Sequence, residues 1–71
     1  MKIRNRIQEL LDERKKTQVW LAKELIKNGQ KGNRNIVSRW CMNQTNPIHP
    51  RIPFLLELFE CSYSDMFYPE D

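Results

Sequence analysis

The chain is poor in cysteine, glycine and histidine, and it has no long apolar run. Its 71 residues include two cysteines, two glycines and one histidine. A zinc site needs four ligands at characteristic spacing, whereas Cys41, Cys61 and His49 supply three and form neither a CxxC nor an HxxxH pair. No apolar run approaches the roughly 20 residues that a membrane-spanning helix requires. We therefore expect no metal site, no membrane span and no disulfide framework.

The start of the sequence also lacks the features of a signal peptide, because no apolar core follows the basic segment Met1–Arg6. Together with two isolated cysteines, which we expect as reduced thiols, this predicts a cytoplasmic protein. A chain of this length fits one compact domain and buries too little surface to enclose a large active site. We therefore expect a single domain over residues 1–71.

Motifs for catalysis are missing as well. The sequence has no P-loop, no Ser/His/Asp or Cys/His arrangement, and no paired carboxylates on one helix face. Gly29–Gly32 has the GxxG spacing with which KH domains clamp RNA, but a KH domain needs a three-stranded sheet that this sequence does not predict. We expect neither an enzyme nor a bound cofactor.

The charge of the chain is distributed unevenly. Residues 1–40 carry eleven Lys and Arg against four Asp and Glu, a net of +7. Residues 41–71 carry one Arg against five acids, a net of −4, so the whole chain has a net charge of +3. A strongly basic first half is typical of a protein that binds a polyanion through that half.

The pattern of apolar residues predicts an all-α, compact fold of four or five helices, because they recur at intervals of three and four and no strand-like alternation is present. Thr17 and Asn33 are suited to cap helices, since their side chains accept hydrogen bonds from free backbone N–H groups. Ser62 with Asp65 resembles a capping box. Tyr68–Asp71 is expected to fray. The predicted helices cover about residues 3–14, 18–27, 33–42 and 51–60, with a short fifth helix after Ser62.

The second and third predicted helices together describe a helix-turn-helix over about residues 17–42. In the third helix Trp40 belongs to an apolar inner face, and Asn35 and Arg39 belong to a polar outer face. A helix fits the major groove of DNA, where Arg can bind guanine and Asn can bind adenine through two hydrogen bonds each. We therefore predict binding to double-stranded DNA.

Three segments carry a family resemblance. Thr17–Leu25 (TQVWLAKEL) resembles the second helix of the lambda-repressor/Cro-like helix-turn-helix family, where Ser/Thr-Gln-x-x-Leu-Ala-x-x-Leu is typical. Ile36–Trp40 resembles the end of its recognition helix, and Asn43–Pro47 resembles the Gly-Lys-x-x-Pro that follows. The turn at 27–33 departs from the family, since it is about five residues longer than the usual short turn. We expect its two glycines to let it bulge outward, and displacement of the recognition helix is the alternative.

The resemblance implies a small transcriptional regulator, repressor-like, that inserts helix 33–42 into the major groove. The candidate DNA-binding residues lie on the two helices, in the long turn and in the loop that follows: Gln18, Lys31, Arg34, Asn35, Ser38, Arg39, Asn43 and Gln44. Members of the family often bind as dimers. We expect a homodimer to use aromatic residues of the acidic C-terminal half: Phe59, Tyr63, Phe67 and Tyr68. The alternative function is a protein-interaction module of the same fold, adaptor or antitoxin-like, that does not read DNA.

Overall fold

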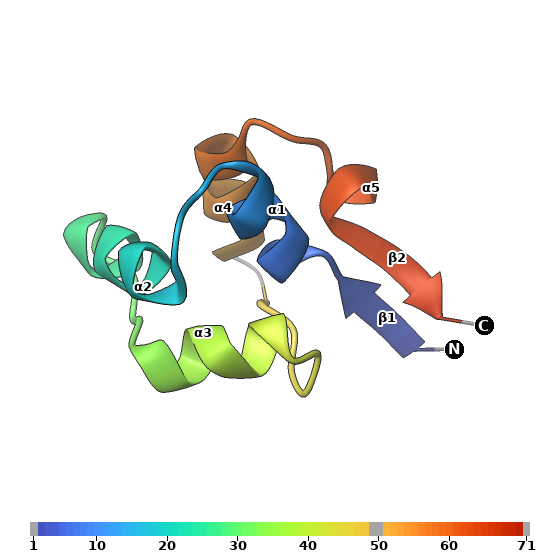
Figure 1. Cartoon of the computed structure of the whole chain (residues 1–71), viewed down its shortest axis with the longest axis horizontal. Coiled ribbons are helices and arrows are strands. Elements are labelled where there is room, and N and C mark those ends of the chain that lie inside the picture. Colours follow the sequence, from blue (N-terminus) through green and yellow to red (C-terminus); the bar gives the residue numbers. More distant parts are fainter. Residues whose placement is uncertain (1, 49–50, 71) are drawn as a thin grey trace.

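The described residues fold into five short helices, and their first and last segments pair as strands of a small sheet (Figure 1). The computed structural model describes residues 2–48 and 51–70. Within these ranges no helix has the length and the apolar content needed to cross a membrane. The elements are β1 (Lys2–Asn5), α1 (Ile7–Glu13), α2 (Gln18–Lys27), α3 (Arg34–Cys41), α4 (Arg51–Phe59), α5 (Tyr63–Met66) and β2 (Phe67–Glu70).

The helices from α2 to α5 confirm the prediction from the sequence. Thr17 Oγ1 and Asn33 Oδ1 each accept a hydrogen bond from the backbone N–H three residues later, at 3.1 and 2.9 Å. These two side chains therefore fix where α2 and α3 begin, as expected of N-cap residues. At the start of α5, the Asp65 carboxylate accepts from the N–H of Ser62 at 3.1 Å. That bond holds the pKa of Asp65 below its ordinary value.

Both ends of the chain differ from the prediction. We expected a helix from Ile3 and a fraying tail at Tyr68–Asp71, but residues 2–5 and 67–70 form an antiparallel pair and α1 begins only at Ile7. Asp71 lies outside the described residues. Strands of four residues are too short to show a clear alternation, and the paired strands lie at opposite ends of the sequence, so no local signal predicts them. The fold is mostly helical with a small sheet and is not purely all-α.

The side chain of Asn5 explains why α1 starts late. Asn5 is a buried polar residue, with 4% of its surface exposed, and its Oδ1 accepts a hydrogen bond from the N–H of Ile7 at 3.0 Å. This contact satisfies a donor at the beginning of α1, as capping side chains do. Ile3, with which the first predicted helix was to begin, is 43% exposed in β1 instead.

The two edges of the sheet are protected. Pro69 lies opposite Ile3, and because proline has no N–H, it offers no donor along the outer edge of β2. On the outer edge of β1, Asn43 Oδ1 accepts from the N–H of Asn5 at 2.8 Å, and Asn43 Nδ2 donates to its carbonyl at 3.3 Å. Asn46 Nδ2 donates to the carbonyl of Ile3 at 2.7 Å. Two side chains of the loop after α3 thus take the place of a third strand.

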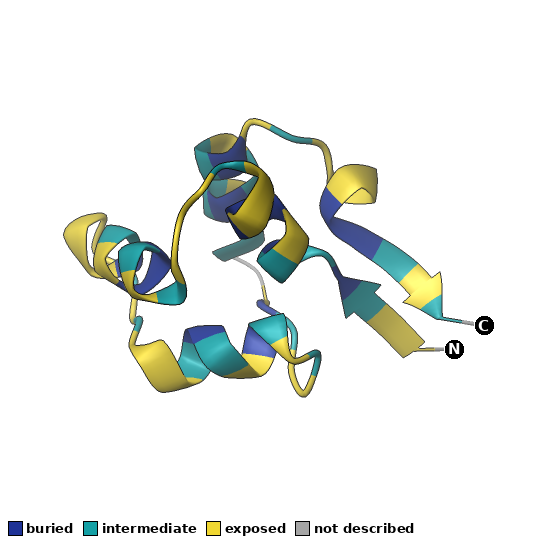
Figure 2. Cartoon of the chain, viewed as in Figure 1, coloured by how far each residue is buried: buried dark blue, intermediate teal, exposed yellow. Residues whose placement is uncertain are grey.

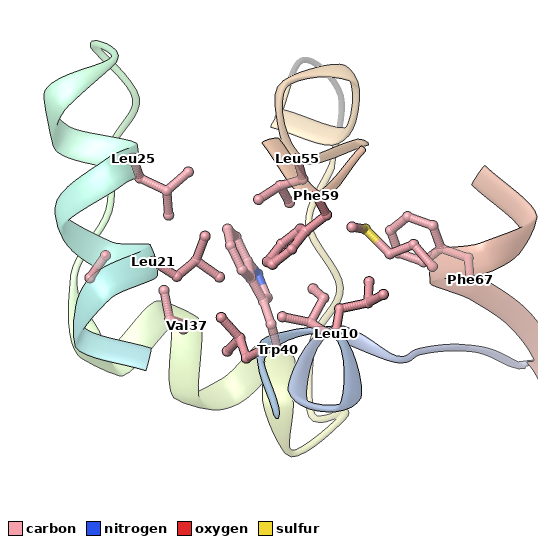
Figure 3. Close-up of a cluster of buried hydrophobic side chains, with 12 residues drawn as sticks. Leu10, Leu21, Leu25, Val37, Trp40, Leu55, Phe59 and Phe67 are labelled. Carbon is pink, nitrogen blue, oxygen red and sulfur yellow. The ribbon is translucent and has the colours of Figure 1, made fainter. Parts of the chain in front are cut away.

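One apolar core joins all five helices and β2, and it holds α3 from its inner side (Figure 3). Trp40 is 2% exposed and points into this core, which confirms the prediction that it is a core residue. Burying a large apolar side chain stabilises a fold by about 1.5–3 kcal/mol, so this side of α3 is firmly held. The buried apolar residues are Ile7, Leu10, Leu11, Leu21, Ala22, Leu25, Val37, Trp40, Leu55, Phe59, Met66 and Phe67.

Candidate nucleic-acid interface

The helix α3 lies along one side of the molecule (Figure 1), and Figure 2 shows both buried and exposed residues along it. Val37 and Trp40 are the buried residues of its inner face. The other face carries four of the candidate DNA-binding residues, all exposed or half-buried: Arg34, Asn35, Ser38 and Arg39. At 100° per residue these four positions fall within an arc of about 140°, so they form one surface. That surface is the centre of the candidate site.

The side chain of Gln18, at the start of α2, is held against α1. Gln18 Nε2 donates a hydrogen bond to Gln8 Oε1 of α1 at 3.0 Å. Gln18 is half-buried, so the candidate phosphate anchor of α2 is fixed in place by its neighbours.

The long turn between α2 and α3 closes against α2. Gly29 has a φ of 78°, and the N–H groups of Gly29 and Gln30 donate to carbonyls of α2 at 3.1 and 2.8 Å. This is a Schellman motif, in which glycine commonly takes the left-handed position. Gly32 then lies against Leu25, since a Cβ at residue 32 would stand 2.6 Å from the Cβ of Leu25. The turn therefore packs on α2 at Gly32, where we expected an outward bulge, and Lys31 beside it is exposed.

The helix α3 ends in the same way as α2, with a residue in the left-handed conformation. Asn43 has a φ of 60°, and the N–H of Gln44 donates to the carbonyl of Arg39 at 2.9 Å. Both polar groups of the Asn43 side chain bind the backbone of Asn5, so this candidate DNA contact also anchors the loop to β1. The side chain of Gln44 is exposed at the tip of the loop.

The electrostatic environment of the site is basic. Between Glu24 and Glu57 the sequence contains no acidic residue, while it contains five Lys and Arg. This stretch includes the turn, α3 and the following loop. Acidic side chains gather elsewhere, around a groove of about 570 Å³ that involves α1 and α5 and is lined by Glu9, Glu13, Glu60 and Asp65 among others. The surface around α3 is therefore suited to a negatively charged partner.

A groove beside this site was not expected from the sequence. It has a volume of about 390 Å³ and is lined by residues of β1, of the loop after α3 and of β2. The sequence predicted a helix over about residues 3–14, so the position of Lys2 and Arg4 in a strand beside the loop after α3 was not expected. The only sequence signal was the basic character of residues 1–6. The lining includes Lys2, Arg4, Asn43, Gln44, Thr45 and Glu70.

Two of the four aromatic residues expected to mediate a dimer, Phe59 and Phe67, are buried, so the prediction is wrong for these two, whereas Tyr63 is 53% exposed. Phe59 is fully buried and Phe67 is 5% exposed. Tyr63 stacks on Phe67 with ring centroids 4.8 Å apart. The guanidinium of Arg6 lies 4.2 Å from the centroid of the Tyr68 ring. Phe59 and Phe67 are therefore part of the core. Tyr63 contacts Phe67, and Tyr68 contacts Arg6.

The two cysteines are half-buried free thiols. Burial raises the pKa of Cys41 to about 11, and burial also raises the pKa of Cys61. In the described part of the chain, no three side chains of His, Cys, Asp or Glu are placed to hold a metal ion. His49 lies outside that part.

Comparison with known proteins found a similar solved structure. No protein-family model and no curated protein matches the chain. The crystal structure of a proposed DNA-binding protein from Bacteroides fragilis is similar, with a TM-score of 0.78 and 28% sequence identity. The match covers 94% of this chain and 100% of that one. This likeness over nearly the whole chain supports a DNA-binding fold.

Proposed function

We propose that the chain is a small cytoplasmic transcriptional regulator, repressor-like, that binds double-stranded DNA with α3 in the major groove. The observation that carries this proposal is the polar face of α3, which stands opposite a buried apolar face and lies in a stretch without acidic residues. The fold of the similar structure supports it. The resemblance of Thr17–Leu25 to the lambda-repressor/Cro-like family supports the same assignment.

On this proposal the face of α3 reads bases. Arg39 has the fork of donors that binds the O6 and N7 atoms of guanine, and Asn35 can pair with the N6 and N7 atoms of adenine. Both side chains are exposed and extend from a helix whose other side is packed in the core. A firmly held helix loses little freedom on binding, which favours a specific complex.

The residues around α3 set its position on the duplex through the phosphates. The backbone N–H groups at the start of α2, beside Gln18, are suited to a phosphate because the helix dipole is positive there. Lys31 on one side of α3 and Gln44 on the other would contact the flanking backbone. These contacts fix register and carry no sequence information themselves. The function needs no catalytic step and no cofactor.

Titration with duplex DNA at several salt concentrations tests this function. We expect an affinity that falls steeply with salt, with a slope of log K against log salt of about −0.9 for each phosphate that the protein neutralises. Duplexes selected from a random pool should bind more tightly than unselected ones by about three orders of magnitude or more. Failure to bind any duplex at low salt would contradict the proposal and favour the protein-interaction module.

A further inference from the structure

The groove between β1 and the loop after α3 is held by a network of three asparagines. Asn5 Nδ2 donates to the carbonyl of Trp40 at 2.9 Å and to Asn46 Oδ1 at 2.7 Å. Asn43 and Asn46 in turn bind the outer edge of β1 at Asn5 and Ile3. The strand is therefore fixed to the end of α3 on one side and paired with β2 on the other. Lys2 and Arg4 are carried at a defined position beside the DNA-facing helix.

The side chains around this groove are hydrogen-bond donors with positive charge among them. Lys2 is exposed, and the side chain of Arg4 is 40% exposed. Gln44 and Thr45, also exposed, line the opposite wall. An ammonium, a guanidinium, an amide and a hydroxyl together match the donors that bind phosphate oxygens in protein–DNA complexes.

One carboxylate also lines the groove. Glu70 Oε1 lies 2.9 Å from Arg4 Nη1, and Glu70 pairs with Lys2 in the register of the sheet. Both side chains of this ion pair are more than a third exposed, so the pair contributes little to stability and can be exchanged for another partner. A phosphate in the groove would compete with Glu70 for Arg4.

We propose that this groove is a phosphate-binding site for the DNA backbone that flanks the bases read by α3. Lys2 and Arg4 supply the charge, and Gln44 and Thr45 supply neutral donors from the opposite wall. Glu70 weakens the site by holding Arg4 when no DNA is bound. This inference rests on the proposed function and adds β1 to the interface, which the helix-turn-helix alone does not include.

Lysine substitutions test the positive wall of the groove. We expect Lys2→Ala to weaken binding to every duplex by about the same factor, roughly three- to tenfold, and to make the salt slope shallower by about one. Lys2→Arg keeps the charge and should retain wild-type affinity. An unchanged salt slope in Lys2→Ala would overturn the proposal.

A pair of carboxylate variants tests the competition. Glu70→Gln and Glu57→Gln remove the same charge, but Glu57 lines a separate groove between α2 and α4. We expect Glu70→Gln to tighten DNA binding several-fold and to steepen the salt slope by about one, and Glu57→Gln to change affinity much less. Equal responses of the two variants would overturn the role of Arg4. Thermal melting of each variant confirms that it is folded.

These outcomes can be separated from failure of the proposed function. If the wild-type chain binds no duplex at low salt, the proposed function is wrong. If the wild-type chain binds with a steep salt slope while the Lys2 and Glu70 variants respond like their controls, only the groove is wrong.

Discussion

The side-chain amide of Asn5 donates a hydrogen bond to the backbone carbonyl of Trp40 at 2.9 Å, which joins the first strand to the last turn of α3. The other polar atom of the same side chain accepts from the N–H of Ile7 and begins α1. A single buried side chain therefore begins α1 and fixes β1 to the last turn of α3. The position of the candidate DNA-binding helix relative to the rest of the molecule depends on it.

Removing this side chain should be costly. Asn5→Ala would leave the N–H of Ile7 without its partner and the carbonyl of Trp40 with the N–H of Asn43 alone, so we expect a loss of about 1–3 kcal/mol in the free energy of unfolding. Asn28→Ala is the control, because Asn28 Nδ2 donates to the carbonyl of Glu24 at 2.8 Å in an exposed position. Its loss should be within about 0.5 kcal/mol. Urea denaturation measures both, and equal losses would contradict a central role for Asn5.

Substitution of either glycine of the long turn should lower the stability of the fold, but for different physical reasons. Gly32→Ala places a Cβ 2.6 Å from the Cβ of Leu25, so we expect a loss of about 1–3 kcal/mol through overpacking. Gly29 has open space around it but a left-handed backbone, so Gly29→Ala should cost about 1 kcal/mol and Gly29→Asn less. Thermal or chemical denaturation separates the three variants. A Gly32→Ala variant as stable as the wild type would show that the turn does not pack on α2.

Arg39 tests the reading of bases by α3. We expect Arg39→Ala to weaken binding to a selected duplex by about 1–3 kcal/mol and to relax the preference at one base pair. Lys23→Ala is the charge-matched control, since Lys23 is exposed on α2 outside the candidate site. Its effect should be small and uniform across sequences. Affinities for a set of single-base variants of the duplex measure the difference, and an unchanged preference in Arg39→Ala would remove Arg39 from base recognition.

The thiol of Cys41 should be unreactive in the folded protein. Burial raises its pKa from 9.0 to about 11, so at pH 8 the folded chain holds about a hundredfold less Cys41 thiolate than the unfolded chain. A Cys61→Ser variant isolates this thiol. We expect its reaction with an aromatic disulfide reagent at pH 8 to be correspondingly slow and to accelerate as the pH rises toward 11. Equal rates in native buffer and in denaturant would contradict this.

The sequence predicted those parts of the fold that depend on neighbouring residues. Thr17 and Asn33 cap helices through bonds to a backbone N–H only three residues away, so their side-chain chemistry was sufficient. Trp40 follows from the apolar spacing within one helix. The polar face of α3 followed from the same spacing, since the inner face leaves the other side exposed.

The parts that were not predicted depend on contacts between distant segments. Asn5 lies 38 residues before Asn43 and 41 before Asn46, and the hydrogen bonds between them form only once β1 meets the loop after α3. Asn43 was predicted to contact DNA because of its position in the family resemblance, and that position does not reveal its hydrogen bonds to β1. Phe59 was expected to contribute to a dimer through the C-terminal half. Its ring lies 6.2 Å from that of Trp20, a contact between α2 and α4 that no local pattern contains.

The antiparallel pairing of β1 with β2 also has a consequence for the connectivity of the chain. Because Lys2 lies opposite Glu70, a few added residues would be enough to connect the two strands into a closed ring. The ring could then be opened at the exposed tip of the turn around Gly29, where a Cβ would meet no atom within 4 Å. Such a circular permutant would present the same face of α3 from a chain that starts at α3 and ends with α2. In such a permutant the helices would follow one another in a different order along the chain while keeping the same packing.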